Sequence, residues 1–205
     1  MFFKSNRKMK QDAAPLVLNV APVPGFFAGT EVATRYAWTK VEELSVGDTV
    51  LTAENGEQMI MGIERGSLTV ASHAAAAGQW PLLVPEGALG NEKALMLSPG
   101  MRIVIEDEVA GALFGQPCVS VRAETLIGYR GIARARVGKT LEHVTLVFDK
   151  PQTVVAEGGL FFDVPDAKGV NNFLPLNDRQ SRLLLRQLSH ADREQRTRKV
   201  ASGWI

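Results

Sequence analysis

Residue types that carry out nucleophilic and acid–base chemistry are scarce in this chain of 205 residues. It has one cysteine, Cys118, and three histidines, His73, His143 and His190. Cys118 stands in the apolar stretch PCVSV, where a buried and unreactive thiol is expected. The histidines lie far apart and form no H-x-x-H or H-E-x-x-H spacing, so no metal site is expected. The single thiol also excludes an internal disulfide and a thiolate-rich zinc or iron–sulfur centre.

Cofactor and nucleic-acid binding are not expected either. The run Gly138–Thr140 reads Gly-Lys-Thr, but the glycine that a phosphate-binding loop requires five positions before Gly138 is absent. A formal net charge of +1 gives no general attraction to nucleic acid or to an acidic membrane. The sequence names no partner; a protein partner and the oligomeric state are left open.

The elements that would position a site are short strands, from about residue 24 to 166. Asn55-Gly56 is a strong hairpin signal, and Gly47-Asp48 predicts a tight turn. In TEVATRYAWTKV the alternation of apolar and polar residues places Val32, Tyr36 and Trp38 inward. Glycine and proline punctuate the strand candidates at short intervals. This pattern predicts a compact all-β fold of short strands and hairpins.

The N-terminal segment, residues 1–23, is expected to be a basic and partly disordered arm. Its apolar stretch is interrupted by Asn19 and Pro22, so it lacks the uninterrupted run of a secretory signal. No segment of the chain reaches the roughly 18 apolar residues that span a bilayer. A cytoplasmic location is therefore expected, with secretion by an unreadable signal as the alternative.

The C-terminal segment, residues 167–205, is expected to be a linker followed by an amphipathic helix. Asn177 or Asp178 is the capping candidate. Leu184, Leu185 and Leu188 share one face, which would dock on the β domain. The basic run Arg193–Lys199 is interpreted as a solvated face, in preference to a nucleic-acid or membrane surface.

Several blocks in the strand region resemble the Hint domain of hedgehog C-terminal regions and inteins, in its bacterial stand-alone form. They span about Pro24 to Pro165 and occur in the family's order. VEELSVGDTVLT, from Val41 to Thr52, matches a family segment in full. The others are GFFAGTEVAT, WPLLVPEGALG, LMLSPGMRIVI, LFGQPCVSVRAETLI and LEHVTLVFDKPQTVVAEGGLFFD.

The resemblance implies self-cleavage or acyl transfer at the N-terminal junction of the domain. That chemistry needs a thiol or hydroxyl on the first residue, which attacks the carbonyl before it. It also needs a histidine that protonates the departing amide nitrogen. By the resemblance these positions are Gly25 for the nucleophile, Met101 for the histidine of the Ser-Pro-x-His segment and Pro151 for the last histidine. None of the three can perform the family's chemistry.

Four residues retain the family's types: Thr30, Ser98, His143 and Asp149. Thr30 should begin a strand, with its hydroxyl facing the wrong peptide bond. Ser98 could donate a hydrogen bond but has no partner base within sequence reach. His143 alone is as well explained by packing in a strand as by a function.

The sequence therefore favours a Hint-type protein that is not an enzyme and serves as a binding or scaffold module. One alternative is an autoprocessing Hint protein with displaced catalytic groups. A second alternative is a β-barrel adaptor that acts through its basic C-terminal helix.

Overall fold

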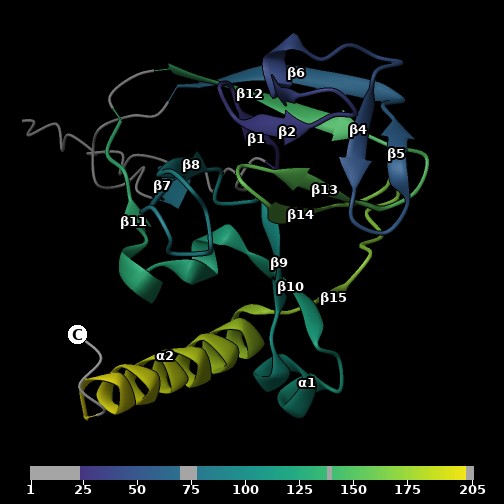
Figure 1. Cartoon of the computed structure of the whole chain (residues 1–205). Helices are drawn as coiled ribbons and strands as arrows, with labels where there is room; N and C mark the ends of the chain where they lie inside the picture. Colours follow the sequence, from purple (N-terminus) through teal and green to yellow (C-terminus); the bar gives the residue numbers. More distant parts are fainter. Residues whose placement is uncertain (1–23, 70–77, 138–139, 202–205) are drawn as a thin grey trace, which may run out of the picture.

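The computed structural model describes residues 24–69, 78–137 and 140–201. Three β-sheets and two α-helices make up this part of the molecule (Figure 1). The expected N-terminal arm, residues 1–23, lies outside the described residues, as does His73. The predicted fold, short strands with a C-terminal helix, is confirmed.

The largest sheet has nine strands and runs through the centre of the molecule. Its main path follows the order β15, β10, β9, β14, β13, β2, β3, and β4 pairs with both β13 and β5. In chain order its strands are β2 (Glu31–Ala33), β3 (Trp38–Lys40), β4 (Thr49–Thr52), β5 (Gly56–Met59), β9 (Arg102–Glu106), β10 (Cys118–Arg122), β13 (Gln152–Ala156), β14 (Leu160–Val164) and β15 (Leu174–Pro175).

Two three-stranded sheets complete the β structure. The first pairs the N-terminal strand with a long antiparallel ribbon, in the order β1 (Phe26–Phe27), β12 (Thr140–Val147), β6 (Gly62–Thr69). The second has the order β11 (Ala133–Arg134), β7 (Leu82–Val84), β8 (Leu95–Leu97). The first sheet matters for the site, because it fixes where the chain enters the domain.

The helices lie together at one end of the molecule, away from β4 and β5 (Figure 1). They are α1 (Glu108–Phe114) and α2 (Asp178–Ala201), and three short 3-10 turns accompany the strands: η1 (Val41–Glu43), η3 (Ala123–Leu126) and η4 (Tyr129–Gly131). Helix α1 begins after Asp107, whose side chain accepts from the Val109 N–H, and ends at Gly115 with φ of 72°. Sequence reasoning placed no helix there.

The two predicted turns are present. Strands β4 and β5 form the hairpin signalled by Asn55-Gly56, although the loop is three residues long and Gly56, with φ of 64°, is already the first residue of β5. At the second turn the Asp48 carboxylate accepts from the Ser45 N–H at 2.7 Å, and Gly47 adopts φ of 96°. Positive φ values of this kind favour glycine over residues with a Cβ.

The inward positions predicted for β2 and β3 are only partly correct. Val32 is fully buried, whereas Tyr36 is 88% exposed and Trp38 is 47% exposed. A turn between the strands, in which the Thr34 N–H donates to the Ala37 carbonyl, breaks the alternation that the sequence pattern assumed. Strand β3 then lies at the edge of the sheet, where side chains meet solvent.

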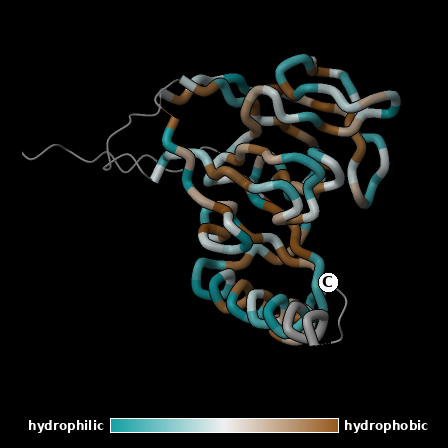
Figure 2. The backbone as a smooth tube through the Cα atoms, turned by 60° about the vertical axis from the view of Figure 1, so that its left-hand side comes forward, coloured by the Kyte–Doolittle hydropathy of each residue, from teal (hydrophilic) through white to brown (hydrophobic). Residues whose placement is uncertain are grey.

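Helix α2 is capped and docked as its sequence predicted. The Asn177 Oδ1 accepts from the backbone N–H groups of Arg179 and Gln180, and the Gln180 side chain accepts from the Asn177 N–H, each at 3.0 Å. This reciprocal pair is a capping box. Leu184, Leu185 and Leu188 are buried against the body of the protein. Teal and brown segments alternate along the helix in Figure 2, as expected for an amphipathic element.

Within the described residues, none of the helices combines the length and the apolar character that crossing a bilayer demands.

Candidate functional site

A pocket of about 420 Å³ opens beside the point where the chain enters the first strand. Strands β1, β6, β9, β10, β12 and β14 and the loop after β14 contribute to its lining. The lining residues used below are Gly25, Met101, Arg102, Arg122, Thr145 and Asp163. The structure therefore brings together two of the three positions that the resemblance assigns to catalysis, Gly25 and Met101, although 76 residues separate them.

Gly25 occupies a position that is closed to a side chain. Its φ of 146° is rarely adopted by residues with a Cβ. A Cβ added there would lie 2.8 Å from the Thr145 Oγ1 and 3.1 Å from the Val144 carbonyl oxygen. Strand β1, which follows Gly25 directly, pairs with β12 through Phe26 and Val144 and through Phe27 and His143. This pairing holds residue 25 against β12. Any side chain at residue 25 would therefore have to displace backbone as well as Thr145.

Met101 takes the space next to Gly25. It is 5% exposed, and the Gly25 N–H points to its sulfur at 3.1 Å. Its own backbone is fixed on both sides, since its N–H donates to the Ser98 carbonyl and its carbonyl accepts from the Ala123 N–H. A thioether is a weak acceptor and carries no proton to donate.

The Pro24 carbonyl, which precedes Gly25, accepts a hydrogen bond from the Thr145 hydroxyl at 2.8 Å. Sequence reasoning missed Thr145. Its spacing of two residues from His143 places the two side chains on one face of β12, but only the pairing of β1 with β12 brings that face to residue 25. The hydroxyl contacts the carbonyl oxygen, so the contact holds the peptide group in place.

The two remaining positions of the final family segment lie elsewhere. Pro151 is half-buried in the turn from β12 to β13, and Asp149, in the same turn, is exposed. Neither lines the pocket. Of the three positions that the resemblance groups together, Pro151 is therefore the one that the structure leaves apart from Gly25.

The other retained residues lie outside the pocket lining. Thr30 and Ser98 are buried, and neither lines the pocket. The ring of His143 occupies the space in which Gly66 would carry its side chain, because a Cβ built on Gly66 would overlap the His143 Cε1. The Nδ1 of His143 is buried and has no hydrogen-bond partner among the described residues. His143 thus packs against Gly66 of the neighbouring strand and is not among the residues that line the pocket.

Charged groups gather at the polar end of the pocket. Arg102 and Arg122 are cross-strand partners on β9 and β10, and the Arg102 Nη1 donates to the Ser120 carbonyl at 3.1 Å. Burial and the neighbouring Arg122 charge lower the pKa of Arg102, and the Asp163 carboxylate opposes them. Asp163 is itself buried and accepts from the Asn171 side chain and the Asn172 N–H at 3.0 and 3.1 Å. The lining suits a ligand that carries polar groups of both signs.

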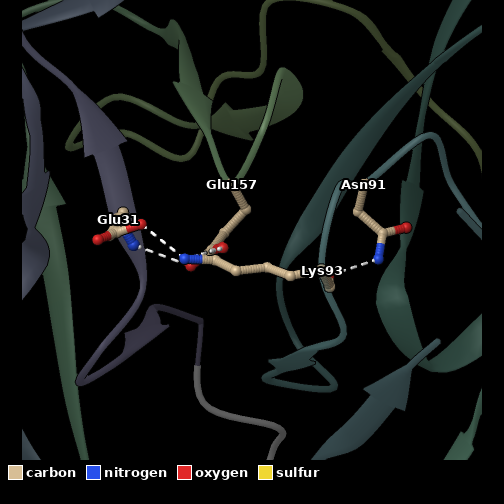
Figure 3. A network of polar contacts seen from close by, with 4 residues as sticks. All are labelled: Glu31, Asn91, Lys93 and Glu157. Carbon is tan, nitrogen blue, oxygen red and sulfur yellow. Dashed lines mark hydrogen bonds and ion pairs between the residues drawn. The ribbon is translucent and has the colours of Figure 1, made fainter. Parts of the chain in front are cut away.

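A separate polar network fixes the strand that follows the entrance (Figure 3). The Lys93 Nζ lies 2.7 Å from the Glu31 Oε2 and 3.9 Å from the Glu157 Oε2, while the Glu31 N–H donates to the Glu157 Oε1 at 2.9 Å. The Asn91 side chain donates to the Lys93 carbonyl at 2.8 Å. The hydrogen bond to Glu31 and the charge of Glu157 raise the pKa of Lys93. This network ties β2 to the turn between β13 and β14.

No group of three histidine, cysteine, aspartate or glutamate side chains in the described part of the chain is arranged to hold a metal ion. Within the pocket lining there is also no cysteine and no histidine. The groups around Gly25 include neither a nucleophile paired with a base nor a proton donor of the histidine type.

Comparisons with known proteins found one family profile and several solved structures that are similar to this chain. The sequence profile of the Hint domain matches residues 24–161. An intein-like domain from Clostridium thermocellum is similar at 14% identity, over 69% of this chain and 99% of that one, with a TM-score of 0.43. The MchDnaB-1 intein is similar at 14% identity, over 67% and 98% of the two chains, with a TM-score of 0.40. No protein of curated function matches the sequence. The profile match covers well over half of the molecule, and the chain belongs to the Hint domain family.

Proposed function

We propose that this Hint domain does not cleave or splice itself, is not an enzyme, and serves as a binding or scaffold module. The observation that carries the proposal is the geometry at Gly25. In the family's chemistry a side chain at this residue attacks the carbonyl of the preceding residue, and here a Cβ would collide with Thr145 and with the backbone of Val144. No atom is available to accept the acyl group.

The proton donor of the family's reaction is replaced as well. An amide nitrogen must be protonated as its bond breaks, and the group beside the Gly25 nitrogen is the Met101 sulfur. Catalytic groups that act as a unit are strongly non-additive, so the loss of one removes most of the benefit of the others. The absence of both the nucleophile and the proton donor supports a site without self-cleavage activity.

The binding role is supported by what remains of the site. The pocket of about 420 Å³ is still open, although the groups that would do chemistry are replaced. Volumes of this order are typical of ligand pockets, roughly 300–1,000 Å³. Its lining combines apolar side chains with the arginine pair and the buried Asp163 carboxylate.

The test is intact-mass spectrometry of the purified full chain after prolonged incubation with and without dithiothreitol. We expect the wild type to keep its full mass in both conditions. A fragment that begins at residue 25 would overturn the proposal, because it would require a working nucleophile in the wild type.

Engineered variants test whether the absence of the nucleophile and the histidines explains the proposed lack of self-cleavage. The triple change Gly25→Cys, Met101→His, Pro151→His restores the family's residue types, but the new side chain at residue 25 would still collide with the Thr145 hydroxyl. We expect the triple variant to remain intact. Adding Thr145→Ala removes the closer of the two contacts, and we expect cleavage by added thiol in this quadruple variant before it appears in the triple variant.

A further inference from the structure

A second groove, of about 450 Å³, lies between helix α2 and the two 3-10 turns η3 and η4. It shares no lining residue with the pocket at Gly25. One wall is a face of α2, and the other is the chain from Thr125 to Tyr129. The α2 wall consists of Arg182, Leu185, Arg186, Ser189, His190 and Arg193.

The α2 wall carries a row of positive charge. Arg182, Arg186 and Arg193 are spaced by four and seven residues, which places them on one helical face. All three are exposed. Among the described residues, neither Arg182 nor Arg186 makes an ion pair or a side-chain hydrogen bond, and Asp178, one turn before Arg182, does not pair with it.

Two of the acidic groups near this face are already engaged. Asp192 holds the Arg130 side chain through two contacts, of 2.6 and 2.8 Å. Glu194 lies 3.5 Å from His190 on the next turn of the helix. The groove therefore presents Arg182 and Arg186, whose charges no ion pair among the described residues compensates.

The opposite wall is apolar and firmly held. Ile127 is 43% exposed at the groove, and Leu185 on the α2 wall is buried. Arg130 stacks over the Tyr129 ring with its guanidinium carbon 5.0 Å from the ring centroid, and its bidentate pair with Asp192 joins η4 to α2. The groove is thus preformed, so a ligand need not order it on binding.

We propose that this groove binds an acidic, extended segment of a partner protein, whose carboxylates pair with Arg182 and Arg186 and whose apolar side chain contacts Ile127. The inference rests on the binding role proposed above and not on the loss of self-processing. Arginine suits this partner because its planar donors match a carboxylate in bidentate geometry. Alternation of charge and apolar surface in a concave site matches a peptide chain better than a uniform polyanion.

Two other anionic partners fit the observations less well. A helix that binds a membrane surface presents its apolar face to the lipid, whereas Leu184, Leu185 and Leu188 of α2 are buried in the protein. Nucleic-acid-binding domains carry a strong basic excess, whereas the formal net charge of this chain is +1. Anionic vesicles and an oligonucleotide are nevertheless useful comparisons, because their negative charges would pair with the same arginines.

The experiment measures fluorescence anisotropy of a labelled peptide, Glu-Leu-Glu-Glu-Leu-Glu, titrated with the full-length protein at low salt. We expect saturable binding that weakens as salt is added, since exposed charges are screened. A version of the peptide with glutamine in place of glutamate should not bind. The same titration is run with phosphatidylserine vesicles and with single-stranded oligouridine.

The decisive variant is the double charge reversal Arg182→Glu, Arg186→Glu, which should weaken peptide binding at least tenfold. Its matched control, Lys40→Glu with Lys150→Glu, changes the net charge equally at exposed sites on other elements and should bind like the wild type. Both variants should retain the wild-type circular dichroism spectrum; if the reversal perturbs the fold, Arg182→Ala with Arg186→Ala replaces it.

Three results would overturn the inference: no peptide binding, binding that survives the reversal, or binding of vesicles or oligouridine alone. In each case an unchanged intact mass would leave the proposal of a silent Hint site standing. A cleaved wild type that still binds the peptide would refute that proposal and leave this one in place.

Discussion

The surroundings of Gly25 leave little room for a side chain at this residue. The residue adopts a backbone conformation that suits glycine, and Thr145 and Met101 occupy the space around it. A cysteine placed there by mutation would meet both strain and collision. The proposed loss of a nucleophile therefore involves several residues from different parts of the chain, and changing residue 25 alone leaves the others in the way.

The first prediction compares Gly25→Ala with Gly29→Ala. Both glycines have positive φ, but a Cβ at Gly29 meets no atom within 4 Å, whereas one at Gly25 meets Thr145 and Val144. We expect Gly25→Ala to lower the free energy of unfolding by about 1–3 kcal/mol more than Gly29→Ala, because overpacking adds to backbone strain. Urea denaturation measures both. Equal losses in the two variants would contradict the collision.

The second prediction concerns the two tyrosines of the chain. Tyr36 is exposed, whereas burial, more than any other cause, raises the pKa of Tyr129 above its ordinary value of about 10. Tyr36→Phe leaves Tyr129 as the one tyrosine of the chain. In an alkaline titration of this variant followed by tyrosinate absorbance, Tyr129 should ionise at a pH above its ordinary pKa.

The same shift fixes the sign of a stability change. The pKa of Tyr129 is higher in the folded than in the unfolded chain, so its contribution is fully present below about pH 10 and is lost as the pH rises through the folded value. Tyr129→Phe should therefore lose less stability than the wild type above pH 10. Identical alkaline losses in the two proteins would contradict a raised pKa.

Among the elements, α2 is the one whose docking the sequence predicted in most detail. The third prediction uses two adjacent leucines: Leu184 is fully buried, and Leu183 is 42% exposed. Leu184→Ala should lower the free energy of unfolding by about 2–5 kcal/mol, the range for buried leucines. Leu183→Ala should cost less than about 1 kcal/mol, because its side chain already meets water. Chemical denaturation of the two variants provides the comparison.

The elements that sequence reasoning found are those specified locally. Asn55-Gly56 marks its hairpin and Asn177 caps its helix through contacts within three residues. Helix α1 was missed because it is only seven residues long, too short for a helical periodicity, although Asp107 and Gly115 were readable signals at its ends.

The site was harder to predict, for a related reason. Met101 and Gly25 were found through the family resemblance, but Thr145, Arg102 and Asp163 reach the pocket through strand pairings that link distant parts of the chain. Register between strands so far apart is set by packing of the whole sheet, and a single sequence carries little of that information. Pro151, which the resemblance assigns to the same site, does not line the pocket.

Across the whole molecule the formal net charge is close to zero, but the charged side chains are distributed unevenly over the surface. The groove on α2 is lined by arginines, whereas the pocket at Gly25 balances Arg102 and Arg122 against acidic neighbours that include Asp163. Because the two share no lining residue, changes in one should leave ligand binding at the other unaffected. Binding studies on this protein can therefore treat the two features as independent.

The parallel pairing of β15 with β10 determines where the chain can be shortened. Leu174 and Pro175 cover one edge of β10, and the Leu176 N–H donates to the Ser120 carbonyl at 2.8 Å. A protein ended at residue 161, where the family profile stops, would also cut strand β14 in two. It would leave β10 with unpaired backbone groups, a template for self-association. We expect that truncated protein to elute as oligomers or aggregates in size-exclusion chromatography, whereas the full chain elutes as a single species. The segment Leu174–Pro175 thus completes the sheet at β10, and we expect the shortest form of this Hint domain that does not self-associate to include it.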